Sequence, residues 1–181
     1  MQLRDNDRRF GTATRAMHWA GVAVVFAAIA LIEVKDWFPK GSALREGLKS
    51  AHFQLGAIAL VLTLARMLWR LRQTLPAIHP EPPAWQDLAG RALHVLFYVL
   101  LVALPLSGIA TLQARGDEVV LLGMVMPAPL AADPVRREAL KEVHEFLGNA
   151  MMLLIGLHVA AALYHHWVRR DDTLRRMLPP A

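Results

Sequence analysis

Four long apolar stretches dominate this chain, and its polar residues gather between them. The stretches run over residues 17–34, 52–69, 92–112 and 146–167. Each is close to the ~20 residues with which a helix crosses ~30 Å of hydrocarbon, where only a helix satisfies the backbone polar groups of a lone segment. The pattern therefore predicts one domain over residues 1–181, an all-α integral-membrane four-helix bundle with helices at about 16–35, 51–70, 90–112 and 143–168.

The connections between these stretches differ in kind. Residues 70–90 carry four prolines, which favour an extended strap: Pro76, Pro80, Pro82 and Pro83. The connection over residues 113–143 is long for two helices and contains the apolar segment 119–126, followed by Pro127 and Pro129. That length favours a folded cap over one end of the bundle.

The basic residues predict the orientation. Of the 20 Lys and Arg residues, 12 lie in the terminal segments and in or beside the second connection, where Arg66 near the end of the second stretch is counted, and 8 lie in the first and third connections. The positive-inside rule therefore places both termini of this multi-pass chain in the cytoplasm. The net charge of +5 is expected to reflect arginines on the cytoplasmic side that lie against anionic membrane lipid. The chain has no motif that reads nucleic acid, so no nucleic-acid partner is expected.

The chain contains no cysteine, which excludes disulfide frameworks, thiolate metal sites, iron–sulfur clusters and cysteine nucleophiles. Charged residues make up only 19% of the chain, which argues against a disordered chain and against a water-soluble enzyme. The 8 histidines remain as the main carriers of chemistry, because ionisable residues inside membrane helices are costly and usually functional. His79 in the strap and His166, which points away from the face of its neighbours, fit a structural role.

Three histidines share one face of the last helix. His144 and His158 are 14 residues apart, which separates them by about 21 Å along the axis and about 40° around it. His165 follows 7 residues later, about 10 Å further along. His52 opens the second helix at the depth of His144, and His18 opens the first helix near the depth of His158. The sequence thus predicts two transverse histidine pairs at different depths.

Two stacked histidine pairs in a four-helix bundle suit two b-type haems, because each iron takes one imidazole on each face of the porphyrin. A zinc site gathers three or four ligands at one depth and fits this spacing less well. Gly56 follows His52 and Gly148 follows His144 by 4 residues, and we call these two histidines the outer ones. A missing side chain at each glycine would admit a flat macrocycle. Close helix packing is the alternative reason for these glycines. Depth alone also leaves His94 open as an inner ligand.

A lysine precedes each outer histidine. Lys49 and Lys141 stand 3 residues before His52 and His144, so each of these histidines has an ammonium group one turn further out. The two cations could neutralise haem propionates or mark the membrane interface. They could also form a positive funnel that draws a small anion toward the outer pair. The two roles are compatible.

Short motifs spread over nearly the whole chain carry a family resemblance: Met17-His18-Trp19, Lys49 to Gly56, Arg66 to Arg70, Leu93-His94, Ala103-Leu104-Pro105, His144-Glu145, Gly156-Leu157-His158, Ala161 to His166 and Arg170 to Met177. On these motifs the chain resembles the bacterial di-haem cytochromes of the b561 type, and among them the superoxide oxidases. The resemblance implies a multi-pass oxidoreductase of the bacterial inner membrane. It would oxidise superoxide to oxygen on the periplasmic side and pass electrons to ubiquinone on the cytoplasmic side.

The resemblance also implies roles for particular residues. It implies that His18 and His158 ligate the iron of a cytoplasmic haem b, and that His52 and His144 ligate the iron of a periplasmic haem b. The cofactors expected are therefore two haem b groups, with ubiquinone as the electron acceptor.

A ubiquinone site on the cytoplasmic side is a further implication of the resemblance. His94 and His165 are the polar contacts available to it, since a quinone needs hydrogen-bond donors and protons that imidazole can supply. A hydrogen bond between helices is the alternative role of His94. Lys49 and Lys141 would attract superoxide to the periplasmic haem.

Two other functions stay open on the sequence. The chain could be a haem-bearing membrane anchor that links a dehydrogenase or hydrogenase partner to the quinone pool, with the connection over residues 113–143 as a docking surface. It could also be a non-enzymatic carrier that only exchanges electrons with periplasmic redox proteins. The anchor predicts a stable hetero-complex, and the carrier predicts that no quinone binds.

Overall fold

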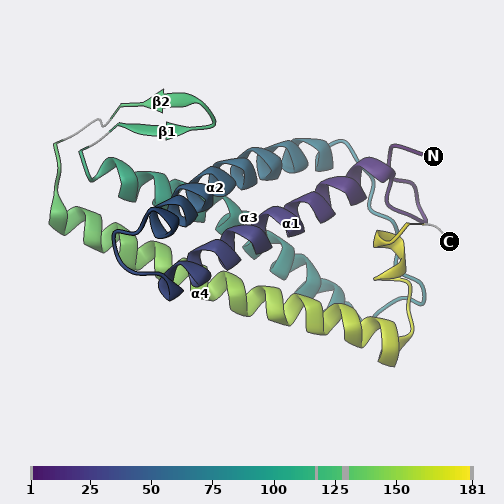
Figure 1. Cartoon of the computed structure of the whole chain (residues 1–181). Coiled ribbons are helices and arrows are strands. Elements are labelled where there is room, and N and C mark those ends of the chain that lie inside the picture. The colour runs from purple at the N-terminus through teal and green to yellow at the C-terminus, as the bar shows by residue number, and fades with distance from the viewer. Residues whose placement is uncertain (1, 117, 128–130, 180–181) are drawn as a thin grey trace.

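The computed structural model describes residues 2–116, 118–127 and 131–179, and the chain is mostly helical. Four long helices run along the molecule: α1 (Thr12–Val34), α2 (Ala43–Arg70), α3 (Ala84–Gln113) and α4 (Pro134–Tyr164) (Figure 1). They alternate in direction, so both termini lie at the same end of the bundle (Figure 1). Short helical turns follow α1 at Lys35–Trp37, extend α4 over His165–Arg169 and occupy Arg175–Met177.

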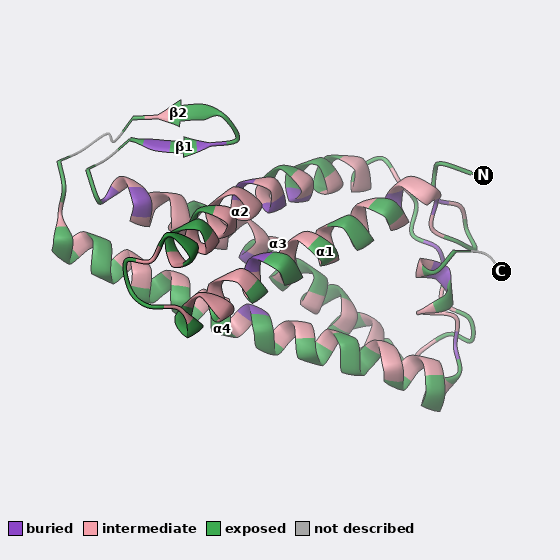
Figure 2. Ribbon diagram, viewed as in Figure 1, coloured by how far each residue is buried: buried purple, intermediate pink, exposed green. Residues whose placement is uncertain are grey.

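The helical regions Thr12–Trp37, Ala43–Arg70, Ala84–Gln113 and Pro134–Arg169 are long and apolar enough to cross a membrane. Exposed residues lie along the outer faces of all four helices (Figure 2). Among them Phe26, Leu68, Val99 and Leu153 are each more than half exposed. Outward-facing apolar side chains suit a bundle whose solvent is lipid, because lipid gives helices no hydrophobic reason to bury them. The prediction of four helices able to span a membrane is confirmed, whereas the prediction of an all-α chain is wrong in one detail, because a two-stranded hairpin accompanies the helices.

Three of the helices begin well before their apolar stretches, namely α2 at Ala43, α3 at Ala84 and α4 at Pro134. The Ser42 side chain caps α2 by accepting a hydrogen bond from the Arg45 amide at 3.3 Å. The Asp133 side chain caps α4 by accepting from the Arg136 amide at 3.0 Å, and Pro134 opens the helix. The first turns of all three helices carry charged residues, so the apolar pattern alone placed their starts too late.

A hairpin covers one end of the bundle, which we call the hairpin end. Its strand β1 (Val119–Leu121) pairs antiparallel with β2 (Met124–Met126). Leu122 and Gly123 form the turn with φ angles of 52° and 78°, as the tight two-residue connections of hairpins require.

The hairpin is held to the bundle by packing and by hydrogen bonds. Its inner side joins a buried apolar cluster formed by Ala57, Leu112, Val119 and Leu121. Gln54 of α2 donates from Nε2 to the Val120 carbonyl and accepts at Oε1 from the Leu122 amide, both at 2.8 Å. The predicted folded cap is therefore confirmed within the described residues, whereas Pro129 lies outside them.

At the other end, which we call the terminal end, three segments of the chain close on one another. Of the strap predicted over residues 70–90, only residues 71–83 lack helix and strand, because α3 already begins at Ala84. Residues 170–179 turn back across this end of the bundle (Figure 1). Arg176 Nη1 donates to the carbonyls of Pro76 and Ala77 at 2.6 and 3.0 Å. Trp19 Nε1 of α1 donates to the Met177 carbonyl at 2.9 Å. The C-terminal segment is thereby tied both to the strap and to α1.

Candidate functional site

The structure brings both predicted histidine pairs together. In the outer pair, His52 of α2 faces His144 of α4 with ring centroids 6.2 Å apart. In the inner pair, His18 of α1 faces His158 of α4 with ring centroids 6.4 Å apart. Two imidazoles on opposite sides of one metal atom, each bound at about 2 Å, have their centroids about 6.3 Å apart. Both pairs therefore have the spacing of axial ligands to a single iron.

The outer pair is held in the tautomer that leaves Nε2 of each ring free for a metal. His52 Nδ1 lies 2.8 Å from the Ala28 carbonyl oxygen in α1, and His144 Nδ1 lies 3.0 Å from the Leu104 carbonyl oxygen in α3. A carbonyl oxygen only accepts hydrogen bonds, so each Nδ1 carries the hydrogen and each Nε2 keeps its lone pair. Carbonyl partners of this kind orient metal-ligating histidines. Ser107 Oγ adds a second contact to His144 Nδ1 at 3.0 Å.

Glycines shape the surroundings of the outer pair. A Cβ atom on Gly108 of α3 would lie 3.2 Å from His144 Cε1, so glycine lets α3 approach this ring without displacing it. The sequence reasoning missed Gly108, whose only signal is a glycine within an apolar helix. A Cβ atom on Gly56 or Gly148 would meet no atom within 4 Å. Close helix packing is therefore not the reason for these two glycines, and a flat group can lie against the backbone there.

The inner pair has a third histidine beside it. The His94 ring of α3 lies 5.9 Å from the His158 ring, and the Phe97 ring packs edge-on against His158 at 5.4 Å. His158 thus faces one imidazole from α1 and one from α3. Over the part of the chain that the structure describes, no group of three or more His, Asp or Glu side chains is arranged to hold a metal ion by itself.

His165 lies just beyond α4 and is held by a buried carboxylate. His165 Nδ1 is 2.5 Å from Asp171 Oδ2, and the Thr173 amide donates to Asp171 Oδ1 at 3.0 Å. Burial raises the pKa of the Asp171 carboxyl, but the hydrogen bonds from His165 and Thr173 outweigh burial and hold this pKa below its usual value. The sequence reasoning missed Asp171, because the left-handed turn at Arg170 that returns the chain toward His165 leaves no pattern in the sequence.

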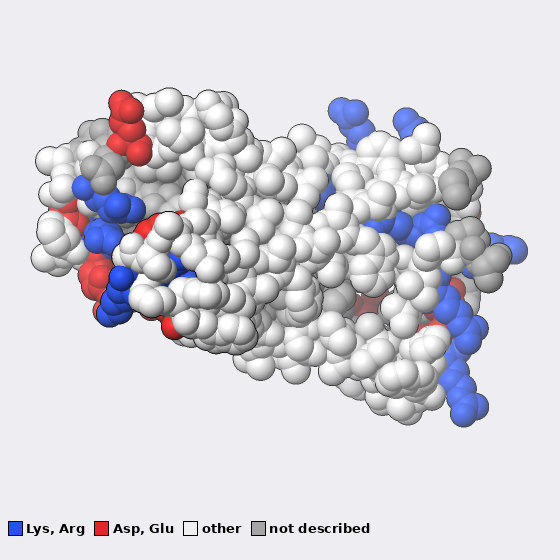
Figure 3. All heavy atoms as spheres, viewed as in Figure 1, with Lys and Arg blue, Asp and Glu red and all other residues white. Residues whose placement is uncertain are grey.

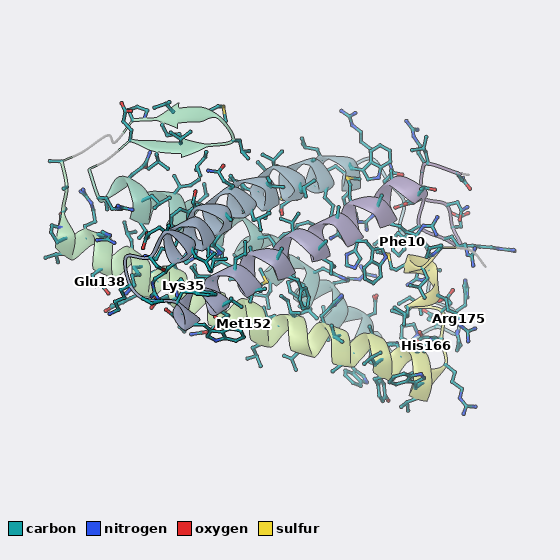
Figure 4. The ribbon with its side chains drawn as sticks, viewed as in Figure 1. Phe10, Lys35, Glu138, Met152, His166 and Arg175 are labelled. Carbon is teal, nitrogen blue, oxygen red and sulfur yellow. The ribbon has the colours of Figure 1, made fainter. Side chains whose placement is uncertain are left out.

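Lys49 and Lys141, two of the lysines at the hairpin end, are each paired with glutamate. Lys49 Nζ is 2.7 Å from Glu46 Oε1, and Lys141 Nζ is 2.7 Å from Glu138 Oε1, which Figure 4 labels on α4. The lysine side chains stay 31% and 44% exposed. Basic and acidic side chains mix at this end, whereas basic ones predominate at the terminal end (Figure 3). The carboxylates weaken the positive field of the lysines, and the exposure keeps part of it accessible to solutes.

A comparison with known families gives the class of protein. The sequence pattern of the family described as "Prokaryotic cytochrome b561" matches residues 9–180, nearly the whole chain. This chain belongs to the prokaryotic cytochrome b561 family. It is 34% identical to cytochrome b561 homolog 1 of Escherichia coli (strain K12) over 171 residues, which are 94% of this chain and 97% of that relative.

Other relatives of this cytochrome b561 match over a similar length. A protein of Yersinia pestis named probable superoxide oxidase CybB is 34% identical over 172 residues, 95% of this chain and 97% of the relative. Cytochrome b561 homolog 2 of Escherichia coli (strain K12) is 29% identical over 186 residues, 98% of this chain and 95% of the relative. The family resemblance seen in the sequence motifs is confirmed.

Family membership makes this cytochrome b561 a multi-pass bacterial membrane protein of electron transport, with b-type haem as its cofactor. The residues present fit that cofactor. Haem iron of the b type accepts two imidazoles on opposite faces, and the structure offers imidazoles in transverse pairs at that spacing. In the outer pair, the backbone carbonyls occupy Nδ1 and leave Nε2 of each ring free.

Proposed function

We propose that this cytochrome b561 is a superoxide:ubiquinone oxidoreductase of the bacterial inner membrane. Two superoxide ions each lose one electron on the periplasmic side and leave as oxygen. Ubiquinone takes the two electrons, together with two cytoplasmic protons, and becomes ubiquinol. The observation that carries the proposal is the presence of two histidine pairs in one bundle, with ring centroids 6.2 Å apart in the outer pair and 6.4 Å apart in the inner pair. The relative named probable superoxide oxidase supports the choice of substrate.

The histidine pairs provide the path across the membrane. In this proposal His52 and His144 hold the periplasmic haem b, and His18 and His158 hold the cytoplasmic haem b. A bound haem supplies one-electron chemistry. The chain supplies neutral imidazoles with fixed orientations, through the carbonyl contacts to Nδ1 of both outer histidines.

The hairpin end attracts the substrate. Lys49 and Lys141 stand one turn from the outer histidines and keep part of their surface exposed despite their glutamate partners. Superoxide is a small anion, so a positive field at this end raises its rate of encounter. Exposed charges act over about 10 Å at 0.1 M salt, and the reaction with superoxide should therefore slow as ionic strength rises.

The terminal end reduces the quinone in this proposal, with His94 and His165 as the polar contacts. The Asp171 carboxylate accepts the hydrogen of His165 Nδ1, which leaves His165 Nε2 to exchange a proton at a quinone oxygen. The same contact keeps the His165 ring in one orientation. Asp171 is thus a positioning residue that acts through His165.

Turnover in vesicles tests this function. Superoxide is generated outside vesicles that hold the haem-loaded full chain and a short-chain ubiquinone, and ubiquinol is measured by its absorbance. The proposal expects about one ubiquinol for every two superoxide ions consumed, from the balance of electrons. The His52→Ala variant should lose this turnover, and His79→Ala, altered in the strap, should keep it.

The same assay separates the proposal from its alternatives. Haem reduction by superoxide without ubiquinol formation would contradict the proposed acceptor and favour a simple carrier. Absence of any reaction with superoxide, together with a stable hetero-complex on purification, would favour the membrane anchor.

A further inference from the structure

At the terminal end of the bundle, four arginines line one cavity of about 340 Å³. Its walls come from the N-terminal segment, the strap and the C-terminal segment: Arg8, Arg9, His79, Asp172, Arg175 and Arg176. Basic side chains gather on this end of the molecule in Figure 3, and Figure 4 labels Arg175 on the C-terminal segment. Segments far apart in the sequence thus meet around a basic cavity that the proposed electron path does not use.

The wall of this cavity is fixed by contacts within the protein. Arg176 is only 6% exposed, and its Nη1 donates to the carbonyls of Pro76 and Ala77 at 2.6 and 3.0 Å. The guanidinium carbon of Arg176 lies 5.4 Å from the centroid of the Phe10 ring. One of the four arginines that line the cavity is therefore buried and held in a fixed orientation.

The turn that carries two of the exposed arginines is also ordered. The Asn6 side chain accepts hydrogen bonds from the amides of Arg8 and Arg9 at 2.9 and 2.8 Å. The Asn6 amide donates in turn to the Arg9 carbonyl at 3.0 Å. The backbone thus presents both arginines at the cavity in one conformation.

The charge of the cavity is strongly positive. Asp172 is the one carboxylate among the described residues that line it, and its Oδ1 already accepts from the His79 amide at 2.9 Å and lies 3.4 Å from Arg176 Nε. The other three arginines of the cavity form no ion pair with any described residue. An anion entering the cavity would therefore meet several guanidinium groups and a carboxylate that is already paired.

We propose that this cavity binds the phosphate group of an anionic phospholipid. Guanidinium groups present planar forks of N–H donors that match phosphate oxygens. The three segments around the cavity also expose leucines, namely Leu3, Leu75 and Leu178, at 67%, 58% and 37%. A phospholipid offers both phosphate and hydrocarbon, whereas free phosphate would use the arginines alone. Basic pockets at the cytoplasmic ends of membrane helices bind anionic head groups in this way.

A bound head group would join the three segments that close the terminal end. The C-terminal segment reaches α1 through the hydrogen bond from Trp19 Nε1 to the Met177 carbonyl, next to His18 in the sequence. The lipid would thus stabilise the structure around the inner pair. This inference concerns a second site and does not depend on the proposed reaction with superoxide.

Binding of short-chain lipids to the haem-loaded full chain in neutral detergent tests the inference. The probes are dihexanoyl phosphatidylglycerol, dihexanoyl phosphatidylcholine and inorganic phosphate, and calorimetry gives their affinities. We expect phosphatidylglycerol to bind tighter than phosphatidylcholine. Each of Arg9→Gln and Arg175→Gln should weaken phosphatidylglycerol about fivefold, as loss of one basic contact to an anionic head group does. The matched control is Arg72→Gln, an exposed arginine of the same strap that lies outside the cavity.

The outcomes are distinct. Weaker binding in the two cavity variants with an unchanged Arg72→Gln protein supports the site. Equal affinities for phosphatidylglycerol and inorganic phosphate would keep the phosphate chemistry but assign it to the free ion. Equal affinities for the two lipids, or an equal loss in Arg72→Gln, would overturn the proposal. If a cavity variant loses haem, the unaltered protein still decides, because its phosphatidylglycerol affinity must fall with added salt while that of phosphatidylcholine stays constant.

Discussion

His144 Nδ1 lies 3.0 Å from the carbonyl oxygen of Leu104, 40 residues earlier in the chain. The imidazole is carried by α4, but its orientation is set by α3, whose backbone accepts the hydrogen and whose Gly108 leaves room for the ring. His52 on α2 stands in the same relation to Ala28 on α1. Each outer histidine is thus positioned by the helix before its own, which couples the packing of the bundle to the properties of the outer pair.

Gly108→Ala is expected to disturb the outer pair selectively. The new Cβ would lie 3.2 Å from His144 Cε1, and overpacking of this kind costs about 1–3 kcal/mol. We therefore expect the outer haem to bind roughly tenfold or more weakly, measured as haem retained during dilution. Gly90→Ala is the control, because a Cβ there on the same helix meets no atom within 4 Å. Equal haem loss in both variants would show that the contact with His144 is irrelevant.

Alanine variants of His94 and His18 distinguish the roles of the two rings that face His158. If His94 serves the quinone, the variant should keep both haems and reduce ubiquinone at least tenfold more slowly, as loss of a proton-transfer group does. His18→Ala should instead lose the inner haem. The measurement is haem per chain together with the rate of haem oxidation by ubiquinone. Retention of the inner haem in His18→Ala and its loss in His94→Ala would reverse the assignment of these two residues.

Asp171→Asn should change how stability depends on pH. The pKa of Asp171 lies below its usual value of 3.8 in the folded protein, so its carboxylate stabilises the fold above that value and loses this effect as the pH falls through the folded pKa. The unaltered protein should therefore melt at a higher temperature than the variant at neutral pH, and the difference should shrink only below about pH 4.

A surface carboxylate provides the control for this prediction. Asp87 is 44% exposed and pairs with Arg91 at 2.7 Å, and exposed pairs contribute little to stability. Asp87→Asn should leave the melting temperature nearly unchanged at every pH. A difference between the unaltered protein and Asp171→Asn that stays constant down to acidic pH would contradict the ionised state of Asp171.

Charge reversal at the hairpin end tests the attraction of superoxide. Lys49→Glu and Lys141→Glu should each slow haem reduction by superoxide severalfold at low salt, and should weaken its dependence on ionic strength. Rapid mixing with superoxide over a series of salt concentrations measures both effects. Lys40→Glu, an exposed lysine in the connection between α1 and α2, is the control for net charge. The same rate in all three variants would show that the two lysines do not steer the anion.

The sequence predicted the pairing of histidines because helical geometry fixes depth. Four apolar stretches set four antiparallel helices, and the depth of each histidine then follows from its distance along its own helix. His52 and His144, and likewise His18 and His158, accordingly meet in the structure. The same reasoning could not separate His18 from His94, since both rings lie near His158.

The hydrogen-bond partners of the site histidines could not be predicted, because no sequence pattern marks them. The carbonyls of Ala28 and Leu104 belong to residues whose side chains say nothing about hydrogen bonding. Asp171 reaches His165 only through a turn with a positive φ at a residue other than glycine. The start of α4 at Pro134 was missed because its first turns are charged and lie outside the apolar stretch.

Haem content per chain tests the central claim, the two haem-binding pairs, most directly. Pyridine haemochrome assays with reduced-minus-oxidised spectra should give two b-type haems per chain, one for each histidine pair. The spectrum should keep a single haem in His144→Ala, a different single haem in His158→Ala, and both in the control His79→Ala. One haem per chain in the unaltered protein, or the same haem lost in His144→Ala and His158→Ala, would contradict the account.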